Sequence, residues 1–260
     1  MVLLDNFPFW AVYLGAVVVL LLMAEIGFRI GLRIQRRESE AAGPPITNTV
    51  VGGMLALLAF LMAFAIGIVV EQHNSRKAMV VTEANAVGTA YLRAGFLAEP
   101  DLTTSRDLLQ EYVEIRLAAA ADTAQLEFVQ ISSEEIHGQL WAIVEENVRQ
   151  GNDSDIMGLY IESINDVIDV HTLRLTAVNL RLPRILGLMV YAAMLLSFLL
   201  VGVANSADGK RDFVALLLFS VAFVAVFMII VDLDRPQQGL INVSQTALED
   251  LLRQMTMAGS

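Results

Sequence analysis

Four long apolar stretches, arranged as two pairs, constrain the fold of this chain more than any other feature. The first pair covers about residues 9–28 and 50–70, and the second pair covers about 185–202 and 213–231. Each stretch is close to the ~20 residues that an α-helix needs to cross ~30 Å of hydrocarbon. In lipid every backbone amide must be paired within the protein, so the stretches are predicted to be helices. The sequence therefore predicts an all-α, polytopic membrane protein with four transmembrane helices.

The distribution of charge divides the chain further. Between Glu71 and Leu182 there are eighteen acidic and eight basic residues, whereas the rest of the chain has ten acidic and nine basic residues. This acidity argues against nucleic-acid binding and favours a solvated helical surface. The expected location is the cell (inner) membrane, crossed by multiple passes. Four parts are expected: a first transmembrane helix pair (1–70), an acidic helical extramembrane domain (71–182), a second transmembrane pair (183–232) and a C-terminal helical tail (233–260).

Helical signals fill the acidic segment between the two pairs. The second apolar stretch is expected to continue as one helix toward Pro100, since no earlier proline interrupts it. A later helix is expected to open at Ser132, because Glu135 three residues on completes a capping box, and to end at Gly151. The last helix of the segment is expected to start near Asp153 or Ser154 and to run to Pro183, where the third apolar stretch begins.

The chain carries no recognisable catalytic motif. It has no glycine-rich phosphate loop, no His-Glu-x-x-His motif and no cysteine. His171 lies on the apolar stripe of its predicted helix, so a packed core histidine is favoured over a metal ligand. Glu162, Asp166 and Asp169 share another face of that helix, where a solvated surface is favoured over a metal site. We therefore predict no enzyme activity, no cofactor and no metal.

Small residues recur at helical spacing in the first pair of apolar stretches. Ala59, Ala63 and Gly67 follow one another every four residues in the second stretch, and Gly27 and Gly31 do so at the end of the first. Small residues at this spacing let the backbones of membrane helices approach closely. The pattern predicts tight helix packing, either within one chain or between copies of it.

An aromatic stripe runs beside the small residues of the second stretch. Phe60, Phe64 and Ile68 are also four residues apart. One interpretation is core packing or contact with lipid; the other is an apolar ring that is repeated around a pore and gates it by dewetting. Periodicity alone does not rank this stripe against a rival in the fourth stretch, which consists of Phe219, Phe223 and Phe227.

Charged residues are rare inside the apolar stretches and do not fix the orientation of the chain. Glu25 is the exception, and it can pair with Arg29 one helical turn on. Basic residues close to the membrane number six on each side, so the positive-inside rule gives no majority. The four arginines after the first stretch favour an external domain, whereas the family resemblance described next favours a cytosolic one. The side of the 71–182 domain is therefore left open.

Three segments resemble the bacterial bestrophin-like membrane family, a domain of unknown function that is distantly similar to bestrophin anion channels. The segments are residues 83–93, 160–183 and 232–236, and the resemblance extends over essentially the whole chain. The residues of these motifs for which we expect structural roles are Glu83, Asn85, Asp169, His171, Asp232, Asp234, Arg235 and Pro236.

The resemblance implies a pentameric channel that passes an inorganic anion such as chloride. It also implies four membrane helices and a large helical cytosolic region in each subunit, with an apolar neck on the second helix. Phe60, Phe64 and Ile68 are the positions that match such a neck. Asp232 and Asp234 are too few carboxylates for the calcium site of bestrophins, so no calcium dependence is expected.

Two other functions remain open at the level of the sequence. A non-conducting membrane scaffold or partner-binding protein would also use a bilayer, a homo-oligomer and an acidic domain. A proton-channel stator places a similar domain between two helix pairs, but it needs a carboxylate or proline inside its later spans, and both are missing here. The channel is therefore the preferred hypothesis, and the stator is the weakest.

Overall fold

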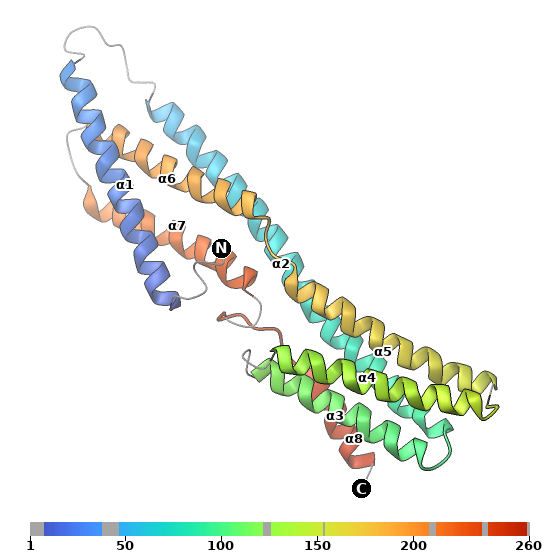
Figure 1. Cartoon of the computed structure of the whole chain (residues 1–260). Coiled ribbons are helices and arrows are strands. Elements are labelled where there is room, and N and C mark those ends of the chain that lie inside the picture. The colour runs from blue at the N-terminus through green and yellow to red at the C-terminus, as the bar shows by residue number, and fades with distance from the viewer. Residues whose placement is uncertain are drawn as a thin grey trace. The chain divides into compact units, whose positions relative to one another are not determined.

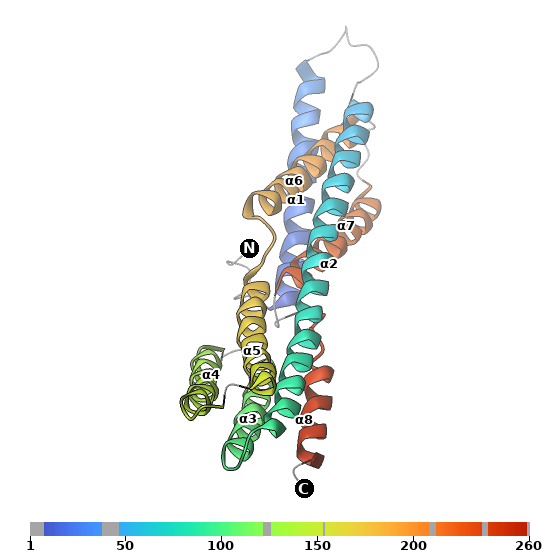
Figure 2. The ribbon, with the colours of Figure 1, turned by 90° about the vertical axis from the view of Figure 1, so that its right-hand side faces the viewer.

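The computed structural model is all-helical in the residues it describes, which are 8–37, 47–121, 126–152, 154–207, 212–235 and 239–258. It divides into two compact units (Figures 1 and 2). The membrane unit consists of residues 1–71 and 181–235, and the second unit consists of 72–180 and 236–260. The C-terminal segment therefore folds with the second unit.

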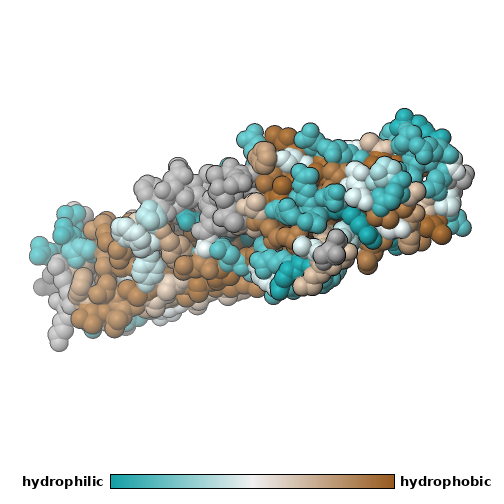
Figure 3. Space-filling view, turned by 90° about the horizontal axis from the view of Figure 1, so that it is seen from below, coloured by the Kyte–Doolittle hydropathy of each residue, from teal (hydrophilic) through white to brown (hydrophobic). Residues whose placement is uncertain are grey.

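The membrane unit contains α1 (Phe9–Arg37), the first half of α2 (Thr47–Arg93), α6 (Arg184–Ala207) and α7 (Phe213–Asp234). Within the described residues, four helical stretches are long and apolar enough to cross a membrane, as predicted. Figure 3 shows brown, hydrophobic residues over much of this unit's surface, whereas teal, hydrophilic residues are frequent over the second unit. The expected all-α membrane class is confirmed.

Close approach of two helix backbones holds α1 against α6. A Cβ atom on Gly27 would overlap the backbone oxygen of Leu199, and a Cβ on Gly202 would overlap the backbone oxygen of Ala24. Gly31 faces a serine side chain of α6 in the same way. Because lipid gives helices no hydrophobic incentive to associate, such close packing supplies much of the attraction between them.

The aromatic residues of α7 belong to the core of the membrane unit. Phe198 of α6 packs against Phe219 and Phe223, with ring centroids 5.4 and 6.0 Å away, and Phe227 is buried. The second apolar stretch joins the same core through one stripe of α2, formed by Leu58, Met62, Ala65 and Val69. The rival stripe of the fourth stretch is thus occupied by packing inside a single chain.

The second unit packs the rest of α2 with four further helices and a short 3-10 turn. These are the turn at Ala94–Phe96, α3 (Asp101–Ala121), α4 (Leu126–Arg149), α5 (Asp155–Asn179) and α8 (Thr246–Ala258). Tyr112 and Tyr160 are the largest fully buried side chains of its core. The hydroxyl of Tyr91 donates to the backbone oxygen of Met255 at 3.3 Å, which ties α8 to α2.

Local signals placed some helix ends correctly and one start wrongly. The hydroxyl of Ser154 accepts a hydrogen bond from the Met157 amide at 3.2 Å and caps α5. Gly151 adopts a φ of 87° just after α4, which suits a glycine at a helix end. The predicted start at Ser132 is wrong, because α4 already begins at Leu126. Burial of Val129 in the turn before Ser132 outweighs the local capping signal.

Arginine and aspartate side chains satisfy backbone groups at two helix ends. In the second unit, Arg76 donates to the backbone oxygens of Ala177 and Leu180 at 3.3 and 2.7 Å, close to the C-terminus of α5. In the membrane unit, the Asp234 carboxylate accepts from the Leu182 amide at 2.6 Å. Orphan groups at helix ends need such partners when water cannot reach them.

The contact between α1 and α6 gives a direct test of the glycine packing. We expect Gly27→Ala to lower the free energy of unfolding by ~1–3 kcal/mol, because the added methyl group forces the two backbones apart. Gly15→Ala is the matched control, since no atom lies within 4 Å of the position of its Cβ. Thermal stability of the two variants in detergent, followed by size-exclusion chromatography, measures the difference. Equal stability of the variants would contradict this account of the packing.

Candidate functional site

One face of α2 in the membrane unit has no partner within the described chain. The side chains of Phe60 and Phe64 are 67% and 55% exposed, and the small residues Ala59, Ala63 and Gly67 beside them are exposed as well. No atom lies within 4 Å of a Cβ built on Gly67. The buried stripe of α2 lies on the opposite side of the helix, so this face is left open.

The composition of this face differs from that of the exposed face of α1. The exposed face of α1 carries large side chains every four residues, at Trp10, Leu14, Val18, Leu22 and Ile26. Large apolar side chains suit contact with lipid, whereas small residues let another protein backbone approach. The open face of α2 is therefore better suited to contact with protein than to contact with acyl chains.

Ile68 lies off the centre of this open face. It is half-buried and packs against the core of the membrane unit. Each step of four residues rotates about 40° around an α-helix, so the third member of such a stripe lies about 80° from the first. Gly67 and Glu71, both exposed, continue the open face in its place. Phe60 and Phe64 thus share the open face, while Ile68 borders it.

A buried network of charges forms the centre of the second unit. Glu83 of α2 has no exposed surface. Its carboxylate lies 3.0 Å from Nε of Arg116 on α3, forms an ion pair with Arg174 on α5, and accepts a 2.6 Å hydrogen bond from the Tyr112 hydroxyl. Arg174 also donates to the side chain of Gln245 at 2.7 Å. The network therefore joins α2, α3, α5 and the segment that precedes α8.

Two histidine rings pack beside this network. The Tyr112 oxygen lies 3.3 Å from Nδ1 of His171, and the ring centroids of His137 and His171 are 4.9 Å apart. Burial, together with the nearby Arg116 guanidinium, lowers the pKa of His137 to about 4, against an opposing effect of Glu134. Burial also raises the pKa of Tyr112 to about 12. His137 is therefore neutral at physiological pH.

The network is suited to structure and not to metal binding or catalysis. Two guanidinium groups face a single carboxylate, which leaves an excess of positive charge that disfavours a cation. Among the described residues there is no group of three or more His, Cys, Asp or Glu side chains that could hold a metal ion. Partners on α3 and α5 satisfy the Glu83 carboxylate of α2, so the network holds these three helices of the second unit together.

The motif residues occupy different kinds of places. Asn85 and Asp169 are exposed and take no part in the buried network around Glu83 and His171. Asp232, Asp234 and Arg235 are buried at the end of α7, where Asp234 holds a backbone amide. Pro236 lies outside the described residues.

Sequence reasoning did not identify Arg116, Arg174 and His137 as parts of the network. Arg116 is the basic member of an otherwise apolar stripe on its helix, and Arg174 follows His171 by three residues on one face. These two positions could have predicted a buried ion pair, since a charge on a core-facing stripe needs a buried partner. His137 gives no comparable signal, because its partners come from other helices.

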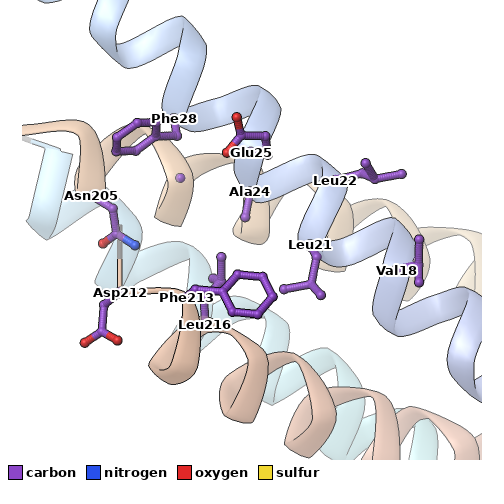
Figure 4. A pocket seen from close by; sticks show the side chains of 11 residues that line it. Val18, Leu21, Leu22, Ala24, Glu25, Phe28, Asn205, Asp212, Phe213 and Leu216 are labelled. Carbon is purple, nitrogen blue, oxygen red and sulfur yellow. The ribbon is translucent and has the colours of Figure 1, made fainter. Parts of the chain in front are cut away.

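A pocket of about 380 Å³ opens among α1, α6 and α7 in the membrane unit (Figure 4). Phe213 points toward Leu21 across it, and Asp212 lies at its edge. Both carboxylates at the pocket already have partners: Glu25 pairs with Arg29 at 2.8 Å, as predicted, and Asp212 accepts from a backbone amide at 3.1 Å. The remaining walls are mainly apolar, which suits an acyl chain better than an ion.

The buried network predicts a large effect of one neutral substitution. We expect Glu83→Gln to lower the free energy of unfolding by ~3–5 kcal/mol, because Arg116 and Arg174 would stay buried without a counter-charge. Glu162→Gln is the matched control: it removes an exposed partner of Arg93, and we expect a change below ~1 kcal/mol. In a Trp10→Phe background, fluorescence of Trp141 reports unfolding of the second unit. Equal effects of the two substitutions would argue against a role of the buried network in holding the helices together.

The neutral state of His137 predicts a dependence of stability on pH. The ordinary pKa of 6.5 applies in the unfolded chain, and the pKa is about 4 in the folded one. Between these values only the unfolded chain binds the proton, so stability falls as the pH decreases from 6.5 to 4. We expect this contribution to reach on the order of 3 kcal/mol. Denaturation of wild type and His137→Phe across this range measures it, and an unchanged slope in the variant would contradict it.

Comparison with known proteins agrees with the motifs and the helical arrangement. The Bestrophin-like domain family matches residues 9–248. A crystal structure of a bacterial bestrophin homologue from Klebsiella pneumoniae, which carries a point mutation, aligns with a TM-score of 0.67 and 14% identity over 95% of this chain and 100% of that one. A second crystal structure, of a membrane protein, aligns with a TM-score of 0.65 and 14% identity, over 94% and 96% of the two chains.

A search of curated protein sequences gives no match. Because the identity to the solved structures is low, the likeness to them is evidence of a shared fold only. The family match, in contrast, extends over nearly the entire chain. The chain belongs to the bestrophin-like family of membrane proteins.

Proposed function

We propose that this protein is a homo-oligomeric ion channel in which α2 of each subunit lines the pore. The observation that carries the proposal is the open face of α2, with Phe60 and Phe64 exposed among small residues. A subunit interface would cover this face, and a ring of phenylalanines would form a narrow apolar neck. Such a constriction controls ion flow by excluding water.

Two features of the chain support α2 as the pore wall over α7. The aromatic residues of α7 pack against Phe198 inside one subunit, so they are not available to a central path. The residues of α2 that flank the phenylalanines are small, which allows neighbouring subunits to bring their helices close together. The apolar neck proposed here consists of Phe60 and Phe64, with Ile68 at its margin.

The number of subunits and the permeant ion rest on the family resemblance. Bestrophins are pentamers that pass anions, and this favours a pentamer of the present chain that passes an inorganic anion such as chloride. A calcium-dependent gate is not part of the proposal, because Asp234 is engaged with the Leu182 amide. A location in the bacterial inner membrane follows from the same resemblance, and no enzyme activity is proposed.

Removal of the aromatic neck should increase ion flux. We expect Phe60→Ala combined with Phe64→Ala to raise flux through liposomes several-fold, because a wider and less apolar neck stays hydrated. Leu14→Ala is the matched control, since Leu14 is a similarly exposed apolar residue on α1. Flux from purified oligomers is measured with an ion-sensitive dye for each variant.

The subunit number should be determined in the same preparations by native mass spectrometry. A pentamer with flux that responds to the α2 substitutions, and not to Leu14→Ala, supports the proposal. A dimer, or the absence of flux from correctly assembled oligomers, would reject the channel. A non-conducting membrane scaffold would then be the better account of the acidic second unit.

A further inference from the structure

We propose that the pocket among α1, α6 and α7 binds a membrane phospholipid whose headgroup carries a primary amine. One acyl chain occupies the apolar part of the pocket, and the protonated amine binds the carboxylate of Asp212 at its edge. The pocket lies within the membrane unit of a single chain, so the lipid site does not depend on the ion path proposed for α2.

The pocket has the size and the lining of a site for an acyl chain. Its volume is about 380 Å³, which lies in the range of pockets that enclose small ligands. Along α1 the lining extends from Val18 to Phe28, which at about 1.5 Å per residue is roughly 15 Å of helix. One leaflet contributes half of the ~30 Å hydrocarbon core, so its depth is the same. The length of the pocket therefore matches one acyl chain of one leaflet.

The pocket opens toward the side of α1 that suits contact with lipid. Val18 and Leu22 line the pocket, and both are exposed members of the face of large apolar side chains on α1. On the opposite wall Phe213 of α7, which is also exposed, points toward Leu21 (Figure 4). A lipid can therefore enter sideways from the bilayer, without passing through water.

Polar groups gather at one end of the pocket. Glu25, Asn205 and Asp212 contribute them, and Figure 4 shows Asn205 and Asp212 at the end away from Val18. Just beyond this end, α1 becomes rich in arginine from Arg29 onward, as expected for a helix that leaves the hydrocarbon. A phospholipid with its acyl chain against Val18 would thus place its headgroup among these polar side chains.

The charges at this end favour an amine over other headgroups. Among the described residues that line the pocket, the charged ones are Glu25 and Asp212, and both are acidic. Oδ1 of Asp212 accepts from the Ala215 amide at 3.1 Å, and the second oxygen can accept from an ammonium group. An ammonium group donates several hydrogen bonds, so Asn205 can share it. Phosphatidylglycerol offers no cation to a carboxylate, and the choline headgroup has no N–H to donate.

The phosphate of the same lipid has a cationic partner in Arg29. Nε of Arg29 pairs with Glu25 at 2.8 Å, and its guanidinium group is well exposed. The remaining N–H groups of the guanidinium can donate to a phosphate oxygen. The end of the pocket therefore offers a carboxylate to the amine and a guanidinium to the phosphate, which is the charge pattern that suits a zwitterionic headgroup.

Native mass spectrometry of the delipidated full chain tests the choice of headgroup. Phosphatidylethanolamine, phosphatidylglycerol and phosphatidylcholine with identical acyl chains are each added in detergent. We expect phosphatidylethanolamine to bind about tenfold more tightly than the other two, as is typical of charge-assisted hydrogen bonds. It should also raise the melting temperature most, because a ligand of the folded state stabilises that state in proportion to its affinity.

The role of the carboxylate is tested by Asp212→Asn. This substitution removes the charge but keeps the cap of α7, since asparagine caps a helix as well as aspartate does. We expect the variant to lose the preference for phosphatidylethanolamine, with a melting temperature in the absence of lipid close to that of wild type. Asp155→Asn, which removes an exposed carboxylate from the first turn of α5, is the matched control and should keep the preference.

A second pair of variants tests the place of the acyl chain. Leu21→Trp puts a larger side chain into the middle of the pocket, so it should weaken the binding of all three lipids several-fold. Leu14→Trp makes the same change on the exposed face of α1 outside the pocket, and it should leave binding unchanged. Size-exclusion chromatography checks the folding of both variants. If Leu21→Trp does not fold, Asp212→Asn alone decides.

The results separate the headgroup from the pocket. Equal binding of the three lipids, a preference for phosphatidylglycerol, or a preference that survives Asp212→Asn overturns the pairing of an amine with Asp212. Binding that a folded Leu21→Trp variant leaves unchanged overturns the location of the lipid. Loss of the preference in Asp212→Asn and of binding in Leu21→Trp, with both controls unaffected, supports the site.

Discussion

The second unit depends on one interaction, the enclosure of the Glu83 carboxylate by two guanidinium groups. A carboxylate with no access to water is stable only when charged or hydrogen-bonding partners replace its hydration. Arg116, Arg174 and the Tyr112 hydroxyl supply that replacement from two other helices. Their need to converge on one point restricts how α2, α3 and α5 can be rotated about their axes. His137 stays neutral beside them because it is buried and because a further positive charge would face Arg116.

The membrane unit is organised by packing and not by charge. Its glycines bring α1 and α6 together, and its phenylalanines fill the space between α6 and α7. What remains exposed is of two kinds, large apolar side chains on α1 and a mixture of small and aromatic side chains on α2. The difference between these faces is the physical basis for placing neighbouring subunits against α2 and lipid against α1.

Much of this architecture was predictable from the sequence because the signals are long and repetitive. Apolar stretches of membrane length indicated the four spanning helices, and the lack of proline indicated the continuous α2. Contacts between distant residues were less accessible. Nothing local in the sequence places Arg116 beside Glu83, and the packing of Val129 overrode the capping box at Ser132. The rotation of α2 about its axis was likewise not predictable, and it determines which residues reach the open face: it buries part of Ile68 and exposes Glu71.

The C-terminal segment has a consequence for the order in which the protein matures. Leu248 and Met255 of α8 are buried in the core of the second unit, and Gln245 binds Arg174. These residues follow α6 and α7 in the chain, so the ribosome makes them only after both later membrane helices. The apolar surface of the second unit that α8 covers therefore stays exposed until both later membrane helices have been synthesised. Closure of the second unit is coupled in this way to completion of the membrane unit.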